Sequence, residues 1–367
     1  MRVRARPGAR RRLAAPVLGL LLLLTSPTHG SGATPSDSQL PSAVSPAALP
    51  RVRLIATGGT ISNRASGRLT ADELIRSIPA VNQIAAVESE QFANAPSASL
   101  SLDQWLALAR RIDEVCREDA GLSGIVVTSG TDTLEELAYF LHLTVRTDKP
   151  LVVVGSMRRP ETPGYEGEAN LLAGFRVAAD PASRGRGVLV VLNDEINSAR
   201  DVTKTDAWRL DTFRSGRYGL LGVVDPDRVV FYRSPERRHT TRSEFDLTAV
   251  RALPRVDIAL VYQGAPGSVI RAMVDQGARG IVVASAGAGA LSGTQGEAIE
   301  YALERHVVVV ISTRAGGGRI AGRPQPEGKA ATVPAEDLAP LKARILLMLA
   351  LTRTNNLTEI QRMFADY

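Results

Sequence analysis

Two turns in this sequence carry the residue types that could do chemistry. The first, Thr57–Thr60, reads Thr-Gly-Gly-Thr and directly follows the apolar, β-branched run 51–56. The second, Ser129–Asp132, reads Ser-Gly-Thr-Asp and follows another run of the same kind. Such runs are typical of strands. Thr60 and Thr131 are therefore predicted just past the ends of two strands, where open parallel sheets bind ligands.

Each turn alone also allows a purely structural interpretation. Gly-Gly turns are common, and Thr60 could be a surface residue. Asp132 and Thr133 could simply cap the helix predicted over 134–145, because Thr133 and Glu136 have capping-box spacing. Backbone N–H groups at that helix start would also favour an anion such as a substrate carboxylate.

Lys204 adds an amine to these groups, because it follows another predicted strand, 187–192. A solvated surface lysine is the usual case. If Lys204 is instead partly buried beside Asp132, desolvation lets the amine accept a proton.

Thr60, Thr131, Asp132 and Lys204 together form an array that suits acyl transfer. A threonine hydroxyl needs a base before it attacks, and a second hydroxyl beside a carboxylate and an amine can relay a proton to water. Glycines such as Gly59 and the neighbouring Gly130 let the backbone approach a ligand closely, and amides at such turns can bind an oxyanion.

The elements that must position these residues alternate between strands and helices. This pattern predicts an α/β fold: a larger N-terminal domain (51–232) with a mainly parallel sheet flanked by helices, a linker (233–254) and a smaller C-terminal α/β domain (255–367). The polar stretch 91–101 predicts turns. The expected strands cover 51–56, 124–128, 151–155, 187–192, 256–262, 280–284 and 307–312; the expected helices cover 102–117, 134–145, 170–178, 268–275, 295–305, 341–351 and 357–364.

The charge pattern argues against a nucleic-acid partner and for export. Six arginines within the first twelve residues account for the whole net charge of +6, so the rest of the chain is neutral. They precede the apolar run Leu13–Leu24, which is short for a membrane span. This layout predicts a signal peptide over 1–33, a flexible leader over 34–50, a periplasmic or secreted protein, and no membrane span in the mature chain.

No metal or cofactor is expected. Cys116 is the only cysteine and lies on the apolar face of a predicted helix, and the four histidines are scattered. The glycine-rich turns 287–290 and 316–318 lack the spacing of dinucleotide-binding or phosphate-binding loops.

From about Arg51 to Tyr367, the chain resembles a bacterial-type (type II, exported) L-asparaginase of the asparaginase/glutaminase family. Five motifs in family order carry the resemblance: Ala56-Thr-Gly-Gly-Thr-Ile61, Gly130-Thr-Asp-Thr-Leu-Glu-Glu136, Val154-Gly-Ser-Met-Arg158, Arg200-Asp-Val-Thr-Lys204 and Leu341-Lys-Ala-Arg-Ile-Leu-Leu347.

The resemblance implies hydrolysis of L-asparagine, with L-glutamine as a further substrate, through a β-acyl-enzyme on Thr60. It implies that Thr131, Asp132 and Lys204 form the second catalytic group. Asp132 would also bind the substrate α-ammonium, and Ser97 would help to bind the α-carboxylate. Family members have a larger and a smaller α/β domain and assemble as homotetramers.

The sequence departs from the family pattern at several positions. Family members place a tyrosine in the loop after the first strand, whereas 61–100 contains none, and Tyr165 or Tyr218 would have to replace it. Polar residues usual in the family are also exchanged: Ala98 and Ala290 replace polar side chains, Ser129 replaces a histidine, and Glu166 replaces an aspartate. Each lost polar contact to the substrate costs about 1–3 kcal/mol.

Two other functions fit part of this pattern. One is an exported asparaginase-like protein that binds an amino acid or related ligand with weak or no turnover. The other is a periplasmic solute-binding protein, which shares export and two α/β domains but leaves the array of Thr60, Thr131, Asp132 and Lys204 unexplained.

Overall fold

The computed structural model describes residues 48–322 and 331–367, and these belong to one compact unit, Ala48–Tyr367. The predicted signal peptide and most of the predicted leader lie outside the described residues. Across the described ranges, no helix is both long enough and apolar enough to cross a membrane.

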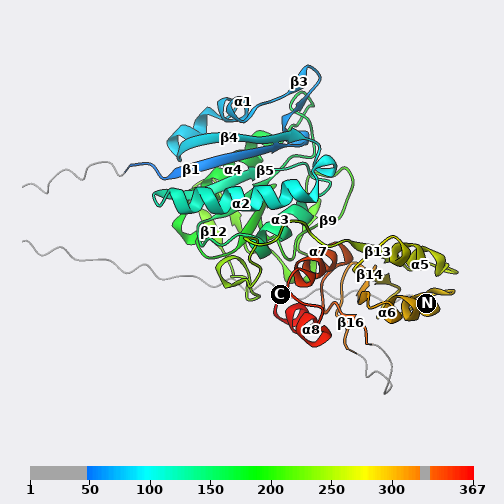
Figure 1. Ribbon diagram of the computed structural model, residues 1–367. Coiled ribbons are helices and arrows are strands. Elements are labelled where there is room, and N and C mark those ends of the chain that lie inside the picture. Colours follow the sequence, from blue (N-terminus) through cyan, green and yellow to red (C-terminus); the bar gives the residue numbers. More distant parts are fainter. Residues whose placement is uncertain (1–47, 323–330) are drawn as a thin grey trace, which may run out of the picture. The chain divides into compact units, whose positions relative to one another are not determined.

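An eight-stranded sheet forms the core of the N-terminal region (Figure 1). Its strand order is β12-β11-β8-β7-β6-β5-β1-β4, and the five strands from β4 to β7 run parallel. The remaining strands pair antiparallel. The strand bounds are β1 Arg51–Gly58, β4 Ala86–Ala95, β5 Leu122–Thr128, β6 Leu151–Val154, β7 Val188–Leu192, β8 Glu195–Ser198, β11 Gly222–Val224 and β12 Val229–Phe231.

Helices cover both faces of this sheet, because its central strands are apolar on both sides. Ile55 and Val127 point to one face and pack with α2 and α3, whereas Leu54 and Val126 point to the other and pack with α1 and α4. The helices are α1 Ala71–Arg76, α2 Leu102–Glu118, α3 Leu134–Thr144 and α4 Gly167–Ala179 (Figure 1). The side-chain alternation of buried strands therefore explains the layered fold.

A second, smaller sheet lies in the C-terminal region. All of its strands are parallel, in the order β13-β14-β15-β16. The elements are β13 Val256–Leu260, α5 Ser268–Asp275, β14 Gly280–Ser285, α6 Gln295–Glu304, β15 Val308–Thr313, β16 Val333–Pro334, α7 Pro340–Leu351 and α8 Leu357–Asp366. The prediction of a large, mainly parallel sheet with a smaller α/β domain is confirmed.

Strand β4 corrects the expectation of turns over 91–95, whereas a short 3-10 turn follows at Ser97–Ser99. It covers ten residues at the edge of the large sheet and pairs with β1. Its polar side chains form ion pairs instead of a core: Glu88 contacts Arg51 and Arg53, and Glu90 contacts Arg111. An edge strand of this kind carries neither the apolar run nor the strict alternation by which buried strands are predicted.

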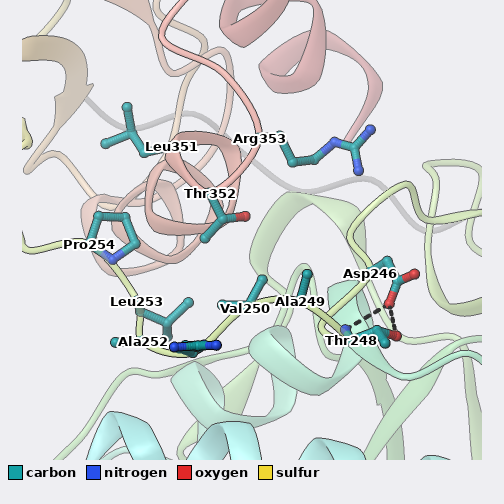
Figure 2. A pocket seen from close by; sticks show the side chains of 11 residues that line it. Asp246, Thr248, Ala249, Val250, Ala252, Leu253, Pro254, Leu351, Thr352 and Arg353 are labelled. Carbon is teal, nitrogen blue, oxygen red and sulfur yellow. Dashed lines mark hydrogen bonds between the residues drawn. The ribbon is translucent and has the colours of Figure 1, made fainter.

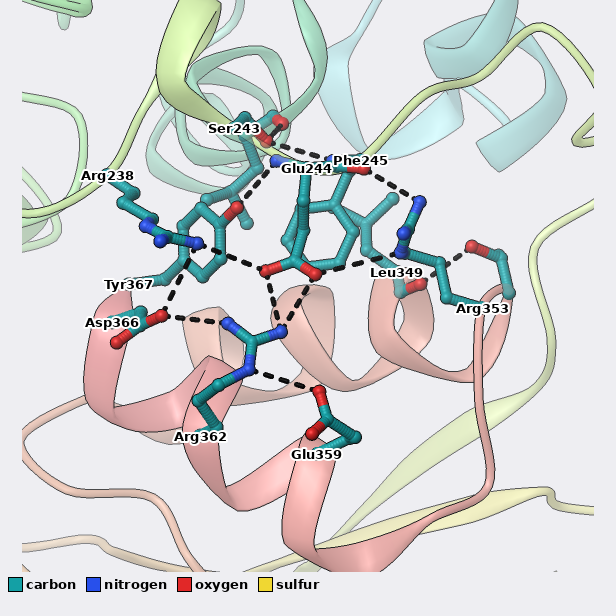
Figure 3. A network of polar contacts seen from close by, with 12 residues as sticks. Arg238, Ser243, Glu244, Phe245, Leu349, Arg353, Glu359, Arg362, Asp366 and Tyr367 are labelled. Carbon is teal, nitrogen blue, oxygen red and sulfur yellow. Dashed lines mark hydrogen bonds and ion pairs between the residues drawn. The ribbon is translucent and has the colours of Figure 1, made fainter.

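The connector between the two sheets is fixed to the C-terminal helix by charged groups (Figure 3). Both carboxylate oxygens of Glu244 accept hydrogen bonds from Arg362, at 2.9 and 3.0 Å. The backbone N–H of Glu244 donates to the hydroxyl of Tyr367, whose side chain is fully buried. Residues 233–254 are thus held against α8 although they form no strand or α-helix.

Candidate active site

The turn after β1 lies directly against the turn after β5. Gly58 and Gly59 have φ values of 105° and 92°, a region that glycine adopts at little cost. A Cβ on Gly59 would lie 2.3 Å from the backbone nitrogen of Gly130, so the two turns touch. This proximity follows from the register, because Ala56 of β1 is paired with Thr128 of β5. Thr60 and Thr131 accordingly belong to adjacent loops.

Thr131 lies within hydrogen-bond distance of Lys204. The Lys204 Nζ donates to the Thr131 hydroxyl at 3.1 Å and forms an ion pair with Asp132 at 2.8 Å. Thr131 is buried, the Lys204 side chain is 16% exposed, and the Asp132 side chain is 77% exposed. The hydroxyl and the amine are thus largely shielded from water, while the carboxylate faces solvent.

Ser97 lies next to Gly130 and to the start of α3. Its buried hydroxyl accepts a hydrogen bond from the backbone N–H of Thr133 at 3.3 Å, and a Cβ on Gly130 would lie 2.9 Å from its Oγ. The predicted capping box of α3 is wrong, because the side chain of the N-cap residue Thr133 forms no capping hydrogen bond. The Thr133 N–H is satisfied by Ser97 instead, which ties the first polar loop to the start of α3.

The backbone amides at the turns differ in availability. The N–H of Gly59 donates to the Ala95 carbonyl at 3.0 Å and is therefore occupied. The N–H groups of Thr60 and Thr131 have no acceptor among residues 48–322 and 331–367. The N–H groups of Gly130 and Asp132 likewise have no acceptor in these ranges, so several amides of the two turns are available to bind an oxyanion.

The two tyrosines considered as replacements for the loop tyrosine form hydrogen bonds with groups other than the Thr60 hydroxyl. Tyr165 donates its hydroxyl to the Ile61 carbonyl at 2.9 Å, next to Thr60 along the chain, and burial raises the pKa of its phenol. Tyr218 donates to Asp337 at 2.8 Å. Within the part of the chain that the structure describes, the Thr60 hydroxyl forms no hydrogen bond with a tyrosine.

Glu166, which stands where the family has aspartate, has a local structural role. Its carboxylate accepts hydrogen bonds from the backbone N–H groups of Met157 and Arg158. These amides belong to the turn that follows β6, so Glu166 holds that turn against the start of α4.

Three charged side chains, those of Lys342, Arg200 and Asp337, lie near the backbone segment that leads to Lys204. Lys342 is 2% exposed and donates to the carbonyls of Arg200 and Val202. Arg200 forms two hydrogen bonds with Asp337, at 2.7 and 3.1 Å. Burial alone would raise the pKa of Asp337, but these bonds outweigh it and hold the pKa at about 2.

The structure places the predicted site residues on adjacent loops, with Thr60 next to Gly59 along the chain. Gly59, Gly130 and Ser97 are in mutual contact through Gly130, and Lys204 bonds to Thr131 and Asp132. Glu135 and Lys342, which contact the Lys204 segment, were not predicted. The Glu-Glu pair in the 130–136 motif was the available signal for Glu135, whereas a lysine inside an apolar helix was the signal for Lys342.

One cavity lies beside the Lys204 segment, and a larger one lies elsewhere in the molecule. One, of about 270 Å³, is lined by Glu135, Arg200, Asp337 and Lys342 together with the turn 316–318. The other, of about 850 Å³, lies between the connector and the end of α7 (Figure 2). It is lined by none of the predicted site residues. No group of three or more His, Cys, Asp or Glu side chains in the described ranges is arranged to hold a metal ion.

The fold is that of an α/β protein with a larger and a smaller domain, and loops at the end of its large sheet gather hydroxyl, amine and carboxylate groups. Comparison with known proteins gives the family. Residues 51–237 match the family model "Asparaginase, N-terminal", and residues 255–364 match "Glutaminase/Asparaginase C-terminal domain". The chain therefore belongs to the asparaginase family, as its motifs predicted.

Individual relatives are similar over most of their length. L-asparaginase 2 of Bacillus subtilis is 41% identical over 329 residues, covering 87% of each chain. A "Probable L-asparaginase periplasmic" of Haemophilus influenzae is 39% identical over 329 residues, covering 87% of this chain and 93% of the relative. The crystal structure of a probable cytoplasmic L-asparaginase from Campylobacter jejuni is 38% identical, with a TM-score of 0.83, and covers 87% of this chain and 100% of that one.

Proposed function

We propose that this protein hydrolyses L-asparagine to L-aspartate and ammonia, with L-glutamine as a further substrate. The observation that carries the proposal is the contact of Lys204 with both Thr131 and Asp132, beside a glycine turn that presents Thr60. The family and the names of its relatives support the substrate class.

In the first step, the Thr60 Oγ attacks the carbon of the substrate carboxamide and loses its proton to a base. We assign the binding of the oxyanion that forms to the N–H groups of Thr60 and Thr131, a proposal supported by their lack of an acceptor in the described residues. When the tetrahedral intermediate collapses, the C–N bond breaks and nitrogen leaves as ammonia after taking up a proton. The substrate acyl group then remains as an ester on Thr60.

In the second step, water hydrolyses this ester. Lys204 enters this step as a neutral amine. The Thr131 hydroxyl takes a proton from the attacking water and passes its own proton to this amine, whose resulting positive charge is balanced by Asp132. When the C–O bond to Thr60 breaks, the Thr60 oxygen takes this proton back through Thr131, the aspartate product leaves, and the Thr60 hydroxyl and the neutral amine are restored. From the family resemblance, we propose that Asp132 also binds the substrate α-ammonium and that Ser97 binds the α-carboxylate; the exposure of the Asp132 carboxylate supports the first assignment.

The test is ammonia release from asparagine and glutamine by the purified protein and by the Thr60→Ala variant. We expect release by the native protein and a loss of about 10³-fold or more in kcat for the variant, because the nucleophile is gone. Equal release from both proteins would refute the role of Thr60.

A second candidate function is a protein of the same family that binds an amino acid with weak or no turnover. The engagement of Tyr165 with Ile61, rather than with the Thr60 hydroxyl, favours it. Calorimetry that detects asparagine binding without ammonia release would support this alternative.

Export and assembly are further parts of the proposal. The arginine-rich start and the run Leu13–Leu24 support export, and a relative from Haemophilus influenzae bears a periplasmic name. N-terminal sequencing of protein from the periplasm tests whether 1–33 is removed. We propose a homotetramer from the family resemblance, and light scattering of the purified protein tests it.

A further inference from the structure

The strand that carries Lys204 is not part of the large sheet. Strand β9, Thr203–Lys204, has two residues and pairs only with β10, Phe213–Arg214, among the described strands. A two-stranded ribbon of this length has little stability of its own. Other contacts must therefore fix the backbone from which the Lys204 side chain reaches Thr131.

The carboxylate of Glu135 supplies the first of these contacts. Its Oε1 accepts hydrogen bonds from the backbone N–H of Lys204 at 3.1 Å and from the Thr203 hydroxyl at 3.0 Å. Glu135 lies in the first turn of α3, three residues after Asp132, and is 5% exposed. One helix start therefore sets the position of Thr131 and of the lysine that contacts it.

The ammonium of Lys342 supplies the second contact from a different helix. Helix α7 places the Lys342 Nζ against the carbonyls of Arg200 and Val202, just before β9. Burial lowers the pKa of Lys342 to about 8, and the negative charge of Glu135 opposes that decrease. The segment 200–204 is thus held by a carboxylate on one helix and an ammonium on another.

Folding stability alone does not account for this arrangement. The second carboxylate oxygen of Glu135, Oε2, is buried and has no hydrogen-bond partner in the described residues. Burying charged groups with incomplete hydrogen bonding costs several kcal/mol, and apolar side chains of similar volume often give equal or greater stability. The buried charges of Glu135 and Lys342 are better explained by their hydrogen bonds to the segment 200–204, which fix its backbone.

We propose that Glu135 and Lys342 are positioning residues, which hold the Thr203–Lys204 backbone so that the lysine amine reaches the Thr131 hydroxyl. This inference rests on the proposed function, because it assigns Lys204 a role in catalysis. Neither Glu135 nor Lys342 is required to touch substrate.

The experiment compares Glu135→Asp with Glu135→Gln. The aspartate keeps the charge but withdraws it by one methylene, whereas the glutamine keeps the length and an oxygen that can accept both hydrogen bonds. We expect Glu135→Asp to lower kcat for asparagine at least about tenfold, with KM changed less than about threefold, because a misplaced group loses mainly transition-state stabilisation. Glu135→Gln should retain most of the activity. Glu136→Asp, one residue along the same helix, is the matched control and should stay within about twofold of the native kcat.

A double variant separates positioning from a general structural effect. In the Lys204→Met background, Glu135→Asp should cause no further loss of kcat, because the group that it positions is absent. An equal loss in both backgrounds would overturn the proposal, and so would a native kcat in Glu135→Asp. Thermal unfolding of each variant shows whether the protein is folded.

A crystal structure of the Glu135→Asp protein tests the placement without reference to activity. We expect the distance from the Lys204 Nζ to the Thr131 Oγ to exceed about 3.5 Å, the limit of a hydrogen bond. An unchanged distance would overturn the positioning role. If the native protein releases no ammonia, or if the Thr60→Ala variant releases as much as the native protein, the proposed function fails. The crystal structure of the Glu135→Asp protein would still decide whether Glu135 positions Lys204.

Discussion

Replacement of Lys204 by methionine tests the proposed proton relay most directly. The change removes the donor that contacts Thr131 at 3.1 Å and Asp132 at 2.8 Å but keeps an unbranched side chain of similar length. Loss of a positioned proton-transfer group reduces rates by about 10²–10⁴-fold. We therefore expect kcat for asparagine to fall by this amount.

The same substitution should change stability little. The Lys204–Asp132 ion pair has one largely exposed partner, and such pairs contribute about 0–1 kcal/mol. For a folded unit of this size, a loss of 1 kcal/mol lowers Tm by about 1–2 °C. A large loss of activity at a nearly constant Tm is thus the expected signature.

The assay measures ammonia release under saturating asparagine, together with thermal unfolding. Lys149→Met is the matched control, because Lys149 donates to three backbone carbonyls away from the site, those of Asp119, Ala120 and Leu122. The control should lose stability but keep its kcat. A Lys204→Met protein with a kcat within about threefold of native would refute the relay.

Three further predictions concern the nucleophile turn, the tyrosine beside it and the response to acid. Gly59→Ala should abolish activity and lower the free energy of unfolding by several kcal/mol, because its Cβ would lie 2.3 Å from the Gly130 nitrogen at a φ of 92°; urea unfolding measures this, and a native-like midpoint would contradict it. Tyr165→Phe should lower kcat only about fivefold, because one hydrogen bond to the Ile61 carbonyl is worth about 1 kcal/mol; a loss above 100-fold would instead assign the phenol to proton transfer from the nucleophile. Burial lowers the pKa of His239 to about 4, so between pH 6.5 and 4 the unfolded chain binds more protons than the folded protein. The free energy of unfolding should therefore decrease by about 3 kcal/mol from this group as the pH is lowered from 6.5 to 4. His239→Asn should weaken this pH dependence, and parallel curves of stability against pH for the two proteins would exclude the histidine as its source.

The buried strands and the site turns were predictable because a single physical pattern marks them. Strand β5 and strand β6 are continuous apolar runs, as expected for strands covered on both faces. Once both turns were assigned to parallel neighbours, the proximity of Thr60 and Thr131 followed from topology. The start of helix α5, at Ser268, was also predicted at the correct residue.

Other parts could not be predicted, because their interactions are distant in sequence. Edge strand β4 is stabilised by ion pairs rather than by an apolar face, so its pattern resembles that of a loop. The partner of the Thr133 N–H is Ser97, 36 residues away, and not the side chain three residues along. The contact between Lys342 and Val202 spans 140 residues and joins elements around different sheets.

This last contact bears on how far the enzyme could be reduced in size. A fragment limited to the larger sheet would contain every group proposed to touch the substrate. It would lack α7 and therefore the Lys342 ammonium, which donates hydrogen bonds to the backbone just before Lys204. Trimming the polypeptide at the connector should therefore yield a fragment with its nucleophile present and its proton acceptor misaligned. If Lys342 positions the lysine as proposed, the smaller domain contributes to catalysis without contacting the substrate through this residue.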